Sequence, residues 1–140
     1  MDIEDLRRRA EAGSPSAQTI LGISYLHGYD VVMDYNEAFR LLSAAGTSRA
    51  VLNLGIMHAK GMGIPQNLPE ATRLLEAVAL PSDSSDAFAA RIELGRLYSA
   101  ESDTKNALRW YEAAVALAND LEDSEDLQEA RAYIARTKSR

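Results

Sequence analysis

The stretch HAKGMGIPQNLPEATRLLEAV, from His58 to Val78, separates two interpretations of the chain. It contains two glycines one residue apart, Gly61 and Gly63, followed by a helix-like segment. A phosphate-binding loop would follow a strand and match G-x-x-x-x-G-K-[ST] or G-x-G-x-x-G. Neither pattern is present, and Lys60 precedes the glycines instead of following them. We therefore interpret these glycines as a helix end and a turn.

The same stretch belongs to an internal repeat. Leu-Gly occurs three times, at residues 21–22, 54–55 and 94–95, each time with an alanine four residues before the leucine. A second alanine-containing block follows each glycine, after 16, 16 and 12 residues: EAFRLLSAA, EATRLLEAV and NALRWYEAA. Each unit therefore contains two helical segments, and small residues recur where two helices approach closely.

The connection between the two segments aligns without a gap in the first two units. GYDVVMDYNEA, from Gly28, matches GMGIPQNLPEA, from Gly61, and places Asp30 opposite Gly63. Glycine adopts a left-handed backbone freely and aspartate tolerates it, so we expect a left-handed residue at both positions.

The composition favours an all-α chain of ordinary single-domain length. The 140 residues are 46% hydrophobic and 26% charged, with 4 prolines and 8 glycines. Good helix formers are plentiful, and no strand-length alternation is present. We expect helices at about 2–12, 15–27, 35–45, 48–60, 68–79, 85–100, 103–118 and 124–138, with Gly13 ending the first one. Residues 81–86 read as a turn-rich linker and residues 119–126 as an acidic joint.

Charge and cysteine content restrict the partners and chemistry that we expect. The formal net charge of −6 disfavours nucleic acid, and the absence of cysteine removes disulfides and thiol chemistry. The acidic start MDIEDLRRRAEAG does not resemble a signal peptide, and no apolar run is long enough to span a membrane. We expect a cytoplasmic monomer that binds neither nucleic acid nor membranes.

The repeat resembles the Sel1-like repeat, a subclass of the tetratricopeptide-like helical repeats. The residues that carry the resemblance are A-x-x-x-L-G at Ala17, Ala50 and Ala90 and G-x-G-I-P-Q-N-x-x-E-A at residues 61–71. The third unit departs from the pattern, because its connection is shorter. The resemblance implies one α/α superhelical repeat domain over residues 1–140, with about three helix pairs. Its parts would be an N-terminal cap helix at 1–13, repeats at 14–46, 47–80 and 84–119, and a C-terminal cap helix at 123–140.

No chemical motif stands out along the chain. His27 and His58 occupy different positions of their units and lack metal-ligand spacing, and the acidic joint lacks the central glycine and final glutamate of a calcium loop. Nucleophile motifs are absent. Trp110 and Tyr111 align with leucine pairs of the other units and are expected in the core. We expect no catalytic residue, no metal site and no cofactor.

The resemblance implies that the first helix of each pair lines a concave face. Ile23 and Ile56 occupy matching positions, and they would either form an apolar stripe on this face or pack between neighbouring units. Some tetratricopeptide domains bind a C-terminal carboxylate with residues of these helices, and we do not expect that set of residues here. The expected partner-binding residues are Thr19, Ile23, His27, Leu52, Asn53, Ile56, Lys60, Ile92, Arg96 and Ser99.

We therefore expect a non-catalytic protein-protein interaction module that binds a peptide, helix or protein on the concave face. One alternative is a cytoplasmic inhibitor or immunity protein, which would suit the short acidic chain and would associate in a salt-dependent way. A second alternative is an enzyme with an unrecognised site. A third is a piece of a longer array, against which the polar end helices argue.

Overall fold

A computed structural model describes residues 2–80, 84–118 and 123–139, and these residues form eight α-helices and no strand. The predicted helices are confirmed to within one or two residues at each end. The helices are α1 (Ile3–Glu11), α2 (Pro15–His27), α3 (Tyr35–Ala45), α4 (Ser48–Lys60), α5 (Leu68–Ala79), α6 (Ser85–Ala100), α7 (Thr104–Leu117) and α8 (Glu125–Lys138).

Short polar side chains begin these helices and glycines end several of them. The Asp103 carboxylate accepts the backbone N–H of Asn106 at the start of α7. Side chains that cap other helices in the same way are Asp2, Ser14, Asp34, Thr47, Ser84 and Ser124. Gly28, Gly46 and Gly61 follow α2, α3 and α4 in the left-handed conformation that a helix C-terminus favours.

The two long connections have the same backbone conformation, which confirms their alignment. Asp30 and Gly63 have positive φ angles of 60° and 71°. In the first connection the N–H of Asp34 donates to the carbonyl of Tyr25, and in the second the N–H of Asn67 donates to that of His58, both at 2.9 Å. The glycines of the opening stretch are therefore turn residues.

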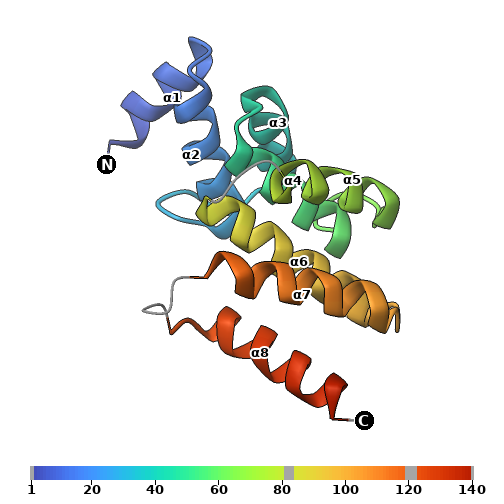
Figure 1. The fold of residues 1–140 in the computed structure, drawn as a ribbon. Coiled ribbons are helices and arrows are strands. Elements are labelled where there is room, and N and C mark those ends of the chain that lie inside the picture. Colours follow the sequence, from blue (N-terminus) through green and yellow to red (C-terminus); the bar gives the residue numbers. More distant parts are fainter. Residues whose placement is uncertain (1, 81–83, 119–122, 140) are drawn as a thin grey trace. The chain divides into compact units, whose positions relative to one another are not determined.

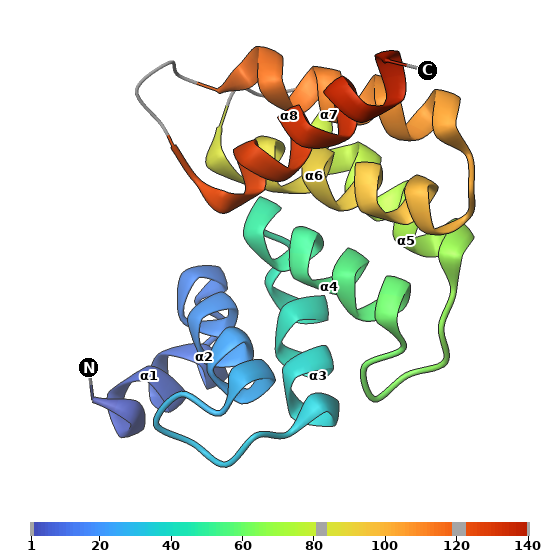
Figure 2. The same ribbon diagram turned by 90° about the horizontal axis from the view of Figure 1, so that it is seen from below.

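The chain divides into two compact units, Met1–Leu74 and Leu75–Arg140. In the first unit, α1 packs on α2, α2 on α3, and α4 on both α2 and α3 (Figure 2). Gly22 lies where α2 meets α3, and a Cβ atom there would lie 2.8 Å from Leu42. The core of this unit includes, among the described residues, one cluster made of Leu6, Ala10, Ala17, Leu21 and Leu41 and a second made of Leu26, Ala38, Leu42, Ala45, Ala50 and Met57.

In the second unit, α6, α7 and α8 lie side by side in chain order (Figure 1). Gly95 of α6 meets the ring of Tyr111 on α7, where an added Cβ would lie 2.8 Å from the ring carbons. The Arg91 guanidinium donates to the carbonyls of Ala79 and Ala113 and so ties α6 to α5 and α7. The core cluster of this unit contains Ile92, Tyr111, Ala114 and Ala130.

A further prediction about the second unit is confirmed. Trp110 and Tyr111 are buried, at 2% and 3% exposure. The apolar face of α8 is directed inward, because Leu127 is buried and Tyr133 and Ile134 pack on the core cluster.

Parts of both predicted joints, at residues 81–83 and 119–122, lie outside the described residues. The described part of the acidic joint is a helix start, where Ser124 caps α8 and Glu125 and Asp126 occupy its first turn. Among the described helices, none is long and apolar enough to cross a membrane.

Candidate functional site

The predicted surface residues of α2 differ in their exposure. Thr19 is buried at 6%, and its hydroxyl donates to the Pro15 carbonyl and lies 2.7 Å from the Thr47 hydroxyl at the start of α4. Ile23 is half-buried and packs on the second core cluster of its unit. His27, at the end of α2, is exposed, and its ring lies 5.1 Å from that of Tyr29.

The predicted residues of α4 follow the same gradation. Leu52 is buried at 7%, whereas Asn53 and Ile56 are half-buried and Lys60 is exposed. The Asn53 amide donates to the Arg49 carbonyl at 2.8 Å. Since α2 and α4 are in contact, the first unit brings the helices that carry Ile23 and Ile56 together.

The predicted partner-binding residues of α6 belong to the second unit, and most of them contact other residues of that unit. Ile92 is fully buried in the core cluster, and Ser99 is half-buried. Arg96 donates to three carboxylates, at 2.7 Å to Glu93, 2.8 Å to Asp126 and 2.9 Å to Glu129. Its positive charge is therefore compensated within the unit.

Arg96 is the centre of a polar network that connects α8 to α6 and α7. Glu129 of α8 accepts hydrogen bonds from Arg96 of α6 and, at 2.9 Å, from the Tyr111 hydroxyl of α7. The hydrogen bond from Arg96 holds the pKa of Glu129 below its usual range. Burial, assisted by the bond to Glu129, raises the pKa of Tyr111. Arg96 is among the predicted partner-binding residues, because its partners Asp126 and Glu129 on α8 are distant in the chain.

We predict that the network makes the attachment of α8 sensitive to acid. The Glu129 pKa is lower in the folded protein than in the unfolded chain. The contribution of ionised Glu129 to stability is therefore complete above the unfolded pKa. It is lost as the pH falls through the folded pKa, below about pH 4. Glu129→Gln should speed amide hydrogen exchange in α8 at neutral pH, by no more than about fivefold, because such part-exposed pairs contribute at most about 1 kcal/mol.

Glu125→Gln is the matched control for this prediction, since Glu125 also lies on α8 but is exposed and outside the network. Equal exchange rates in the two variants, measured by NMR at one pH, would contradict the role assigned to the network.

Two hollows in the first unit were not predicted from the sequence. An open hollow of about 560 Å³ lies at the start of α2 and α4, where Ile20 is partly exposed beside Thr19. Its other lining residues are Pro15, Ser16, Thr47 and Arg49. Hollows of this kind depend on where neighbouring helices begin, which spacing along the chain does not reveal.

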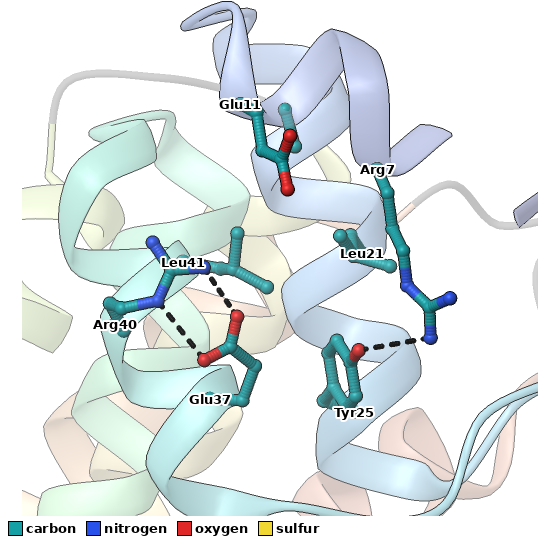
Figure 3. Close-up of a pocket in the computed structure, with 8 residues that line it drawn as sticks. Arg7, Glu11, Leu21, Tyr25, Glu37, Arg40 and Leu41 are labelled. Carbon is teal, nitrogen blue, oxygen red and sulfur yellow. Dashed lines mark hydrogen bonds and ion pairs between the residues drawn. The ribbon is translucent and has the colours of Figure 1, made fainter. Parts of the chain in front are cut away.

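The second hollow is a cavity of about 150 Å³ between α1, α2 and α3 (Figure 3). The Arg40 guanidinium donates to the Glu37 carboxylate, with Nε at 3.0 Å, and Arg7 donates to the Tyr25 hydroxyl at 3.3 Å. The bond from Arg40 lowers the pKa of Glu37. Two arginines and two glutamates line the cavity, so its formal charges balance, and the full set is Arg7, Ala10, Glu11, Leu21, Tyr25, Glu37, Arg40 and Leu41.

Within the described part of the chain, no group of three or more acidic or histidine side chains is arranged to hold a metal ion. His58 packs edge-on against Phe39, with ring centroids 6.0 Å apart. Its Nδ1 and the Nε1 of Trp110 are buried polar atoms without a hydrogen-bond partner among the described residues.

The chain is an α/α helical-repeat protein. Its helices are paired, its motif glycines lie at close contacts between helices, and its first two connections have the same conformation. A family model for the Sel1 repeat matches residues 15–47, 48–79 and 89–119, which is more than half of the chain. The chain therefore belongs to the Sel1 repeat family. Sel1 repeat proteins are generally protein-interaction modules, and the family is typically a non-catalytic scaffold.

Solved structures agree with this assignment. A Sel1 repeat protein from Oxalobacter formigenes is 29% identical, with a TM-score of 0.68, and the match covers 96% of this chain and 98% of that one. A protective antigen of uropathogenic Escherichia coli strains, which displays an SLR fold, is 22% identical with a TM-score of 0.73. That match covers 98% of this chain but 33% of the antigen, and it supports the fold alone. No curated protein matches the chain.

Proposed function

We propose that this chain is a non-catalytic interaction module that holds a protein segment against the first helices of its repeats. The observation that carries the proposal is the pair Ile23 and Ile56, which occupy matching positions on α2 and α4 and are both partly exposed. Thr19 and Leu52 are buried on the same helices and support this surface from within. A preformed helical surface lowers the ordering cost of binding, because its own side chains are already fixed by packing.

The charged edge of this surface favours a partner that combines apolar side chains with an acid. His27 and Lys60 are exposed at the ends of α2 and α4, and Asn53 adds a polar group. Arg96 is omitted from this role since three carboxylates of its own unit compensate it. On α6 of the second unit, Ser99 stays a predicted contact residue of that unit alone, whereas Ile92 is part of the core. The proposal includes a cytoplasmic monomer that binds no nucleic acid, in keeping with the net charge of −6.

Ile56→Asp is expected to weaken partner binding by at least about tenfold, because it places a carboxylate in the apolar part of the surface. The intact chain would serve as bait for cell lysate, retained proteins would be identified by mass spectrometry, and affinity would then be measured with the purified partner. Ser43→Asp is the matched control, since it adds the same charge near the end of α3, at an exposed position outside the surface. Circular dichroism establishes that both variants fold.

Equal binding by Ile56→Asp and wild type would refute this location of the site. Failure of the wild-type bait to retain any protein beyond the support without bait would refute the interaction itself. If the retained partner is an enzyme that loses activity on binding, in a salt-dependent way, the module acts as an inhibitor.

A further inference from the structure

The two long connections of the first unit share a backbone but present different surfaces. We call residues 28–34 the first loop and residues 61–67 the second loop. Each begins with a left-handed glycine, has a left-handed residue two positions later and closes with the same backbone hydrogen bond. Side chains at corresponding positions can therefore be compared directly, and Val32 corresponds to Pro65, as Met33 does to Gln66.

The second loop covers its apolar side chains. Met62 and Ile64 are partly buried and pack on the core cluster that contains Leu42 and Met57. The exposed positions hold Pro65 and Gln66, and the Gln66 amide donates to the Ala59 carbonyl at 2.9 Å. This loop needs no apolar side chain in water to keep its conformation.

The first loop, in contrast, exposes three large apolar side chains within five residues. Tyr29 is 58% exposed, Val32 is 88% exposed and Met33 is 54% exposed. Isolated exposed apolar residues are common, but a group of them in one loop indicates a surface that a partner covers. The loop bulges outward between α2 and α3 (Figure 2), beyond the helix end that carries His27. This surface does not use Ile23 or Ile56.

The charges around the first loop indicate what kind of partner fits it. Residues 28–37 contain Asp30, Asp34 and Glu37 and no lysine or arginine. Glu37 pairs with Arg40, whereas Asp30 and Asp34 are exposed and have no ion pair among the described residues. Asp34 caps α3 by accepting the backbone N–H of Glu37 at one carboxylate oxygen. A second copy of the chain would bring the same acids and a net charge of −6 against this loop, which disfavours self-association.

We propose that the first loop is a docking surface for a protein segment whose apolar side chains are flanked by lysine or arginine. It adjoins the α2–α4 surface at His27, whose ring lies beside Tyr29, but it does not include the apolar residues of that surface. Tyr29, Val32 and Met33 contact the apolar side chains, and Asp30 and Asp34 face the basic ones.

The test replaces two residues of the first loop with the corresponding residues of the second loop. Val32→Pro/Met33→Gln removes two of the three exposed apolar side chains and inserts the residues that the same backbone already accepts at 65 and 66. A displayed library of random short peptides would be selected on the intact wild-type chain. Selected peptides are expected to carry apolar residues beside lysine or arginine, to shift amide NMR signals of residues 28–34, and to bind the exchange variant at least about tenfold more weakly.

A second variant tests the charges without changing the loop conformation. Asp30→Asn/Asp34→Asn keeps a residue that tolerates the left-handed backbone and a residue that caps a helix. It should weaken binding of the selected peptides and flatten its dependence on salt, while Ile56→Asp should leave their binding unchanged. This last comparison separates the docking surface from the proposed function.

Several results would overturn the inference. These are selection of no peptide above background, of peptides without basic residues, or of peptides that bind the exchange variant as well as wild type. Concentration-dependent dimerisation that the exchange abolishes would assign the loop to a second copy of the chain instead.

Discussion

Tyr111→Ala is expected to lower the free energy of unfolding of the second unit by about 3–5 kcal/mol, the range for removing a buried aromatic side chain. The Tyr111 ring is 3% exposed, fills the space above Gly95 and lies 4.8 Å from the ring of Tyr133 on α8. Its hydroxyl donates to Glu129. The substitution therefore removes contacts between α7 and both neighbouring helices at once. Urea denaturation monitored by the fluorescence of Trp110, the single tryptophan, would measure the loss.

Tyr111→Phe is the control that separates the ring from its hydroxyl. It keeps the packing against Gly95 and Tyr133 and removes the hydrogen bond to a carboxylate that Arg96 still pairs. We expect a loss of about 1 kcal/mol at most, the typical net contribution of one hydrogen bond, because the accepting carboxylate is part-exposed. If the alanine variant is no less stable than the phenylalanine variant, the ring does not hold the three helices together as the geometry implies.

The local features of this fold could be predicted from the sequence because they depend on neighbouring residues. Helix starts need a short polar side chain and several ends need glycine, so Asp103 and Gly28 mark boundaries without knowledge of the tertiary structure. The gapless alignment of two units placed the left-handed residues at Asp30 and Gly63, since the same loop geometry recurs in both. Comparison of two repeat units therefore predicts a loop conformation that the sequence of one unit alone would not reveal.

The candidate surface was harder to predict because exposure depends on which helices pack together. Spacing along a helix identifies a face, but it does not say whether that face meets solvent or another helix. Thr19 and Ile92 therefore lie inside their units although they are on the expected helices. Arg96 bonds to Glu129, 33 residues away, through a contact that depends on how α8 folds back. The exposure of Val32 is likewise known only from the structure. It is notable because the loop with the same backbone holds a proline, Pro65, at the corresponding position.

The second large effect concerns the glycine of the repeat motif. A Cβ atom on Gly22 would lie 2.8 Å from both Cγ and Cδ2 of Leu42, which is fully buried, so a shift of its side chain would disturb the core. Gly22→Val is therefore expected to destabilise the first unit by about 3 kcal/mol, at the upper end for overpacking, even though valine is a better helix former than glycine. Thermal and urea denaturation followed by circular dichroism would measure this loss. Ala44→Val, which adds the same β-branching at an exposed position of α3, should have a much smaller effect.

The cause can be tested by a compensating substitution, because Leu42→Ala removes Cγ, Cδ1 and Cδ2, including the two atoms that block residue 22. Leu42→Ala alone leaves a cavity and should cost about 2–5 kcal/mol. Gly22→Val/Leu42→Ala adds three carbons and removes three at the same contact, so its total volume is conserved. The double variant should be more stable than the sum of the two single losses predicts, by at least about 1 kcal/mol. Additive losses would mean that Gly22 is needed for a reason other than the approach of α2 to Leu42.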